Sequence, residues 1–242
     1  MKKTTFAIAV LLLALARPAQ ADFVQSFTTG FQNGGVIPDN SLTGWTDTEI
    51  VNVPGTGLNQ MTDVSVTLNL SGGWNGDLYA YLVHNNQFVV LLNRVGVGSG
   101  GVYNSAGYGN PGMNITLSDQ GANNIHFYQN NSPAYNGSGQ LTGTYQPDGR
   151  NVSPLTAPAT LGATSPTTPL SSFNGLNGNG SWTLFIADVS PGDVMQVNGW
   201  GLDIAAVPEP GSIVEGSIAV LFLGGVVGLY RLKGPKAHPQ PC

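Results

Sequence analysis

The clearest alternation of apolar and polar positions lies in SWTLFIADVSPGDVMQVNGWGLDI, residues 181–204. Trp182, Leu184 and Ile186 share one face of its first half, and Trp200 begins the same pattern in its second half. A period of two is typical of β-strands. The sequence SPGD between the halves favours a turn, because Pro fixes φ and Gly accepts a positive φ. We therefore predict a hairpin whose two tryptophans need an opposing sheet.

Upstream, short stretches carry the same alternation, and none shows a helical period. The cleanest is MTDVSVTLNL, in which valine and leucine alternate with serine, threonine and asparagine. The segments predicted as strands are 45–53, 61–70, 78–84, 87–93, 113–117, 124–128 and 141–148, the last ending in a turn. Residues 87–93 are apolar on both faces, which predicts a central strand. Residues 23–37 are expected to supply an edge strand, Asn75-Gly76 suits a hairpin turn, and 151–179 is predicted as a surface loop.

Composition agrees with short strands joined by turns. Only 9% of the residues are charged, against roughly 25% in ordinary proteins, and the chain has 34 Gly and 16 Pro. Both residues are common in turns and rare inside helices. We predict an all-β fold, a jelly-roll β-sandwich, as one domain over 22–206.

The charge of this domain is strongly negative. Residues 22–206 contain two basic residues, Arg94 and Arg150, and eleven acidic ones, a net charge of −9. Such a surface repels phosphate backbones, so we expect no nucleic-acid binding. It is compatible with Ca²⁺ or with a cationic partner.

The first 21 residues have the pattern of a secretory signal peptide. Lys2 and Lys3 form the positive region, an apolar stretch follows, and Ala19-Gln20-Ala21 fits a cleavage site. The single cysteine, Cys242, excludes an intramolecular disulfide. We interpret it as an incidental tail residue, with lipidation or crosslinking as the alternative.

The composition changes abruptly after residue 206. An apolar segment over 213–230 is long enough for a transmembrane helix across a thin bilayer, and basic residues follow it. The basic cluster places the domain outside the cytoplasm by the positive-inside rule. The simplest interpretation is a plain membrane anchor. The segment is preceded by the four residues Val207, Pro208, Glu209 and Pro210.

This order of a VPEP motif, an apolar helix and a basic cluster resembles the PEP-CTERM sorting signal of Gram-negative bacteria, over 207–236. The resemblance implies recognition by an exosortase and cleavage near the motif. It also implies transient anchoring in the inner membrane before delivery to the cell envelope or to an exopolysaccharide matrix.

The domain itself resembles the P/Homo B domain that follows the catalytic domain of kexin-like and furin-like proteases. The motifs that carry this are MTDVSVTLNL at 61, NGDLYAYLVH at 75, LTGTYQPDG at 141, PLSSFNGLNGNGSWTLFIAD at 169 and NGWGLDI at 198. The resemblance implies a jelly roll, and in those proteases the domain packs on the catalytic domain and stabilises it.

Candidate chemistry within the domain is sparse. His84 and His126 have no catalytic sequence context, so we interpret both as structural and predict no catalytic residue. Asp77, Asp188 and Asp193 lie in or beside predicted turns. Carboxylates and turn carbonyls suit Ca²⁺, and some P domains bind it. We predict one Ca²⁺ site that includes Asp188 or Asp193, with simple turn formation as the alternative for each residue.

We therefore expect a non-enzymatic, exported envelope or matrix protein that acts by binding or structure, with polysaccharide as one class of partner. The alternative is an accessory module of proteolysis that docks in trans on a subtilisin-like serine endopeptidase. A free-standing enzyme is the third hypothesis.

Overall fold

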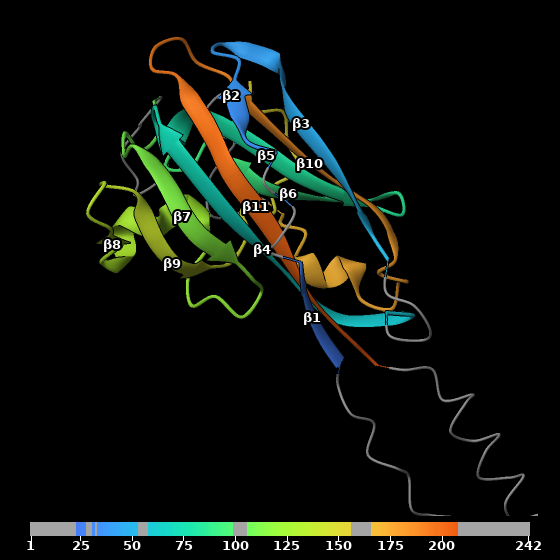
Figure 1. The fold of residues 1–242 in the computed structure, drawn as a ribbon. Helices are drawn as coiled ribbons and strands as arrows, with labels where there is room; N and C mark the ends of the chain where they lie inside the picture. The colour runs from blue at the N-terminus through green and yellow to red at the C-terminus, as the bar shows by residue number, and fades with distance from the viewer. Residues whose placement is uncertain are drawn as a thin grey trace, which may run out of the picture. The chain divides into compact units, whose positions relative to one another are not determined.

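The computed structural model describes residues 23–27, 31, 33–52, 58–98, 106–155 and 166–207. These residues form two β-sheets, so the predicted all-β class is confirmed (Figure 1). Sheet A has the strand order β1-β11-β4-β7-β9-β8, and β2 also pairs with β11. Its strands are β1 (Phe23–Phe27), β2 (Gly35–Ile37), β4 (Gln60–Gly72), β7 (Gly112–Leu117), β8 (Ala134–Tyr135), β9 (Leu141–Tyr145) and β11 (Met195–Val207).

Sheet B has the strand order β3-β10-β5-β6. Its strands are β3 (Ser41–Val51), β5 (Leu78–His84), β6 (Gln87–Asn93) and β10 (Gly180–Asp188). All of its pairings are antiparallel, whereas β7 and β9 in sheet A run parallel. The order of strands does not by itself establish jelly-roll connections, which stay a prediction.

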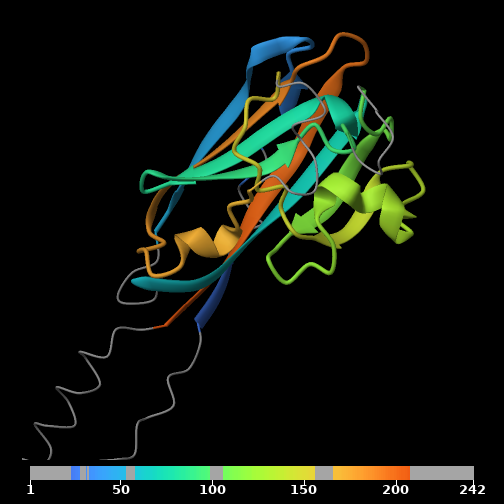
Figure 2. The same ribbon diagram turned by 180° about the vertical axis from the view of Figure 1, so that it is seen from behind.

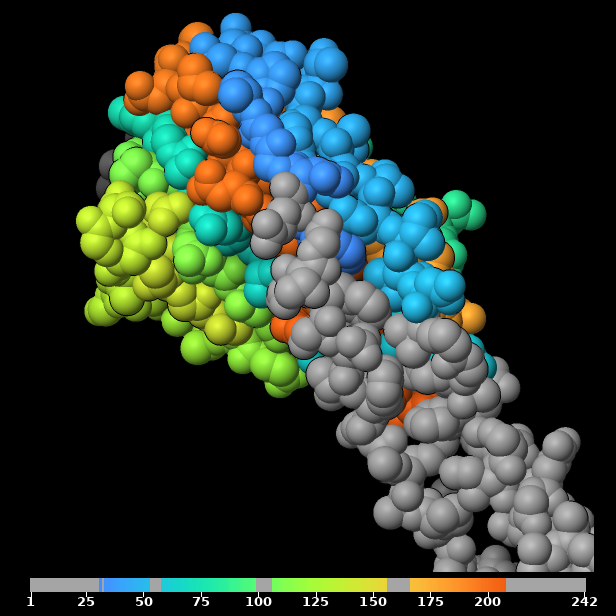
Figure 3. Space-filling model, in the orientation of Figure 1, coloured from blue at the N-terminus to red at the C-terminus, as the bar shows by residue number. Residues whose placement is uncertain are grey.

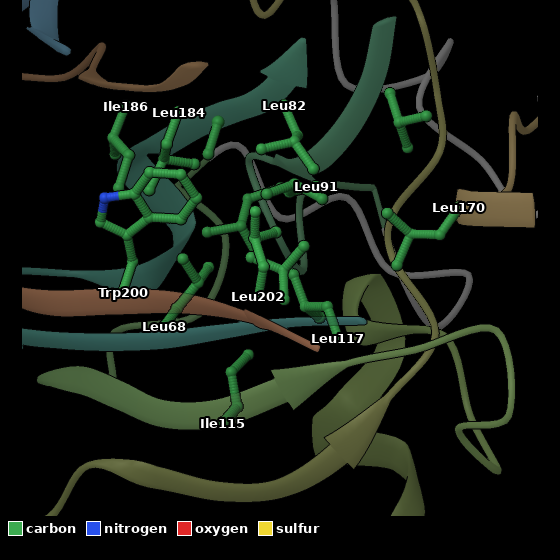
Figure 4. Close-up of a cluster of buried hydrophobic side chains, with 14 of the residues drawn as sticks. Leu68, Leu82, Leu91, Ile115, Leu117, Leu170, Leu184, Ile186, Trp200 and Leu202 are labelled. Carbon is green, nitrogen blue, oxygen red and sulfur yellow. The ribbon is translucent and has the colours of Figure 1, made fainter. Parts of the chain in front are cut away.

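The two sheets meet through their apolar faces. Leu184 and Leu82 of sheet B lie opposite Leu68 and Leu202 of sheet A in Figure 4, and all four side chains are buried. Each apolar position of β4 is buried and the polar positions between them are not, as its alternation predicts. Burying one such side chain contributes about 1.5–3 kcal/mol.

The segment 181–204 forms two strands as predicted, but the predicted hairpin is wrong. β10 lies in sheet B and β11 in sheet A, so the turn between them crosses from one sheet to the other. Trp182 and Trp200 therefore enter the core from opposite sheets. The indole nitrogen of Trp200 donates to Oδ2 of Asp47 on β3, 2.8 Å away. This hydrogen bond joins the two sheets.

The strands predicted at 78–84 and 87–93 are confirmed with those bounds. The central position predicted for 87–93 is wrong, because β6 is the last strand of sheet B. Its edge is covered by the segment after β9: the amides of Asp148 and Gly149 donate to the carbonyls of Leu91 and Val90, at 3.0 and 2.9 Å. An edge strand covered in this way has the apolar composition of a central one.

The strand predicted at 124–128 is a 3₁₀ helix instead, η3 (Ile125–Asn131), which Figure 2 shows near β7 and β9. The side chain of Asn124 accepts a hydrogen bond from the amide of His126 and starts the helix. Likewise Asn75-Gly76 forms a 3₁₀ turn, η1 (Asn75–Asp77), rather than a hairpin turn, because β4 and β5 belong to different sheets.

The described part of the predicted surface loop 151–179 is not all at the surface. It contains the 3₁₀ helix η5 (Leu170–Phe173), whose Leu170 and Phe173 are buried in the core. The side chain of Asp119 accepts hydrogen bonds from the amides of Leu170 and Ser171, at 2.9 and 2.7 Å, and so fixes the start of this helix.

The predicted signal peptide, the apolar segment 213–230 and Cys242 lie outside the described residues. Within the described ranges, no helix is long and apolar enough to cross a membrane. Of the predicted sorting motif, only Val207 is described. It ends β11, where it pairs with Gln60, while Pro208, Glu209 and Pro210 lie outside.

Candidate functional site

The carboxylates predicted from the sequence meet at one end of the sandwich. Asp77 ends η1 and Asp188 ends β10, and the amide of Val189 donates to the carbonyl of Asp77 at 2.9 Å. Asp193 lies in the turn between β10 and β11, and its negative charge raises the pKa of Asp77. The prediction missed Asp39, whose negative charge raises the pKa values of both Asp77 and Asp188. Asp39 also accepts a hydrogen bond from the amide of Gly192 at 3.3 Å.

Asp188 is the most deeply buried of these carboxylates, with 1% of its surface exposed. Its Oδ1 accepts from the amide of Ser190 at 3.3 Å, and its Oδ2 has no hydrogen-bond partner. The pKa of Asp188 is raised to about 6, mainly by burial and also by the nearby charge of Asp77, against the lowering effect of the Ser190 amide. Burial also raises the pKa of Asp77 above its ordinary value.

Arg94 is the basic member of this cluster, and no sequence motif around it indicates this role. It follows β6 in a left-handed conformation, at φ 48°, and its amide donates to the carbonyl of Leu78 at 2.8 Å. Its guanidinium donates to the carbonyl of Gly76 at 3.4 Å and to the hydroxyl of Ser190 at 3.2 Å. The positive charge lowers the pKa values of Asp77 and Asp188 against the effect of burial.

Asp77, Arg94 and Asp193 of this cluster border a cavity of about 410 Å³. Small-molecule sites are typically clefts of about 300–1,000 Å³. The lining that bears on its chemistry consists of Trp74, Asp77, Arg94, Ser190 and Asp193. A tryptophan inside the turn-rich sequence SGGWNGD was the one signal that could have drawn attention to this place.

The geometry gives limited support to the predicted Ca²⁺ site. In the part of the chain that the structure describes, no group of three or more His, Cys, Asp or Glu side chains is placed to hold a metal ion. Arg94 already brings a positive charge to Asp77 and Asp188. A Ca²⁺ ion at Asp188 or Asp193 would therefore need backbone carbonyls and water as further ligands, and this site stays a prediction.

His84 is buried and packs against the core. Its ring stacks on Trp182 with the centroids 3.9 Å apart and an angle of 4° between the planes. Nδ1 lies 2.9 Å from the carbonyl oxygen of Ser181, and Nε2 lies 2.7 Å from that of Asn177. Nε2 also lies 2.9 Å from the side-chain nitrogen of Asn85, so both ring nitrogens are surrounded by groups of the chain itself.

His126 is part of a buried network at the start of η3. Its Nδ1 lies 2.6 Å from Oδ2 of Asp148, and its Nε2 lies 2.9 Å from the carbonyl oxygen of Val97. A carbonyl only accepts, so Nε2 carries a proton and donates it there. Nη1 of Arg150 donates to the other oxygen of Asp148 at 2.8 Å. The network joins three chain segments and leaves no ring nitrogen free for chemistry.

A second group of aromatic rings lies on the face of sheet B that points away from the core. Tyr81 stacks on Phe185 at 4.7 Å and contacts Phe88 at the same centroid distance. Tyr79 meets Tyr81 edge to face at 5.9 Å. These rings cover one another, so they stabilise the outer face of the sheet and offer less free ring surface than a single exposed ring.

No family model matches the chain, and no curated protein matches it. Among solved structures, the serine protease of Aeromonas sobria is similar with a TM-score of 0.36 and 15% identity, over 82% of this chain and 29% of the other. The structure of that serine protease in complex with the chaperone gives a TM-score of 0.39 and 15% identity, over 83% of this chain and 30% of the chain matched. The present chain thus spans less than a third of the solved chains that it matches.

Proposed function

We propose that this chain is an exported envelope or matrix protein whose β-sandwich binds a partner and catalyses no reaction. The observation that carries the proposal is the state of His84 and His126. Each ring has both nitrogens within hydrogen-bond distance of groups of the chain itself, and among the described residues no hydrogen bond joins either ring to a Ser, Thr or Cys side chain. A general base needs a free nitrogen within reach of the proton that it takes.

The cavity near Arg94 supports binding as the activity. It combines an aromatic side chain with donors and acceptors held by the backbone and by one another. A site of this kind orients a ligand through few polar groups and an apolar surface. The P-domain-like motifs in the sequence agree with a module that has no reaction centre of its own.

Sorting by an exosortase is the second part of the proposal, and it rests on the sequence after Ala206. The full chain, expressed with its export signal in a Gram-negative host that has an exosortase, is predicted to lose its C-terminal segment near Pro208–Pro210. Mass spectrometry of the mature protein measures this directly. A mature protein that still ends in Cys242 in that host would show that the segment is a permanent anchor.

A second candidate function is docking on a subtilisin-like protease, and one feature of the surface favours it. Val36, Leu42 and Val194 are large apolar side chains with 61%, 52% and 56% of their surface exposed. Val36 lies on β2, Leu42 on β3 and Val194 in the turn between β10 and β11. The turn that joins β2 to β3 touches this second turn, because the amide of Gly192 donates to Asp39. Figure 3 shows the blue residues of the first turn beside the orange residues of the second.

Exposed apolar side chains grouped in this way are typical of protein–protein contacts. If the module docks on a protease, Leu42→Asp should abolish co-purification of a subtilisin-like protease from the secreted fraction. Retention of that protease by the variant would remove this candidate.

A further inference from the structure

Trp74 presents an indole ring at the mouth of the cavity. It lies between β4 and η1, and 42% of its surface is exposed. One face of the ring rests on Gly109: a Cβ atom at that glycine would lie 3.4–3.5 Å from three ring atoms. The backbone thus holds the ring in place from one side, and the side chain also lines the cavity.

The polar part of the cavity is fixed in position before any ligand arrives. The hydroxyl of Ser190 interacts with both Asp77 and the guanidinium of Arg94, which also donates to the carbonyl of Gly76. The neighbouring Asp193 adds a second carboxylate to the lining. The site therefore offers charged donors, charged acceptors and a hydroxyl around one aromatic ring, in a conformation that needs little reordering on binding.

We propose that this cavity is a glycan-binding subsite in which Trp74 stacks on a sugar ring and the Asp77, Arg94 and Asp193 side chains hydrogen-bond to its hydroxyl groups. The inference rests on the proposed binding function and names its site and ligand class. A sugar hydroxyl both donates and accepts, so it satisfies carboxylates and a guanidinium together. The C–H face of a sugar ring is apolar and fits the flat face of an indole.

Other ligand classes fit this lining less well. A metal cation or an ammonium group would use the carboxylates but would be repelled by Arg94. A free phosphate or an acidic peptide would use Arg94 but would face Asp77 and Asp193 of the lining, in a strongly acidic domain. A neutral, polyhydroxylated ring avoids both conflicts and uses the aromatic surface.

The test is affinity electrophoresis of the full chain in native gels that contain soluble β-glucan, xyloglucan or galactomannan. The wild type is expected to be retarded in at least one gel, and Trp74→Ala to lower the affinity about tenfold or more. Tyr135→Ala is the matched control, since that ring is 41% exposed but lies on β8 and does not line the cavity. It is expected to bind like the wild type. An unchanged melting temperature shows that each variant is folded.

Asp193→Ala is a second test, which leaves the indole ring of Trp74 unchanged. This variant is also expected to be retarded less than the wild type. A wild type that no glycan gel retards would overturn the inference. Equal retardation of the wild type and Trp74→Ala would overturn it too, but would leave the proposed binding function in place. Shortening of the polysaccharide would instead contradict the proposed function.

Discussion

At the scale of single residues, the histidines and carboxylates decide what the protein can do. A histidine in a strand and a carboxylate in a turn are visible in the sequence, and both histidines were expected to be structural. Their partners were not visible, because Asp148 reaches His126 only through the packing of β9 and η3. Arg94 could not be assigned to the candidate site for the same reason: it lies 96 residues from Ser190 in the chain.

Asp188 makes the stability of the fold depend on pH. Burial raises its pKa to about 6 from 3.8, so the folded state keeps the proton in a range where the unfolded state has lost it. The stabilisation is fully present below about pH 4 and is lost as the pH rises through about 6. Asp188→Asn should therefore raise the free energy of unfolding at pH 8 by about 2–3 kcal/mol relative to wild type.

Urea unfolding at pH 4, 6 and 8 measures this difference between the two proteins. The difference is expected to shrink towards pH 4, where the folded-state carboxyl is protonated and the pH approaches the ordinary pKa of 3.8 that the unfolded state keeps. Asp203→Asn, which keeps Asp188, is the control and should have the same free energy of unfolding as the wild type at each pH. If Asp188→Asn changed the free energy of unfolding by the same amount at pH 4, 6 and 8, the carboxyl of Asp188 would not titrate between these pH values.

At the scale of elements, alternation predicted most of the strands and which face of each is buried, but the strand predicted at 124–128 is the 3₁₀ helix η3. Alternation did not predict which strands are neighbours. β10 and β11 look like a hairpin because a short SPGD turn joins them, yet that turn connects two sheets. A period of two indicates which face of a strand is buried, but it does not indicate which strand it pairs with. The apolar edge strand β6 was misplaced for a related reason, since the covering segment at Asp148 is distant in sequence.

The alternation in β10 predicts losses of stability of unequal size at adjacent positions. Leu184 is buried in the core, so Leu184→Ala should lower the free energy of unfolding by about 2–5 kcal/mol. Thr183 points to the other face, where its hydroxyl meets that of Thr48 at 2.8 Å. Thr183→Ala should cost about 1 kcal/mol or less. Chemical denaturation compares the two variants, and equal losses would contradict the assignment of the faces.

At the scale of the whole molecule, the sequence predicted an exported, acidic, all-β domain with little chemistry of its own. Three of the carboxylates at the candidate site were also predicted, although as Ca²⁺ ligands. The aromatic and basic members, Trp74 and Arg94, were not, because a cavity arises only when η1, β6 and the turn after β10 meet. The function proposed here therefore depends on how separate turns come together at one end of the two sheets.

The central claim is that the sandwich binds a partner without converting it. Size-exclusion chromatography with light scattering, applied to the full chain after incubation with the polysaccharide that retards it, measures binding and chain length together. The account predicts that protein co-elutes with polysaccharide of unchanged length. A polysaccharide that becomes shorter, or that leaves the protein to elute alone, would contradict it.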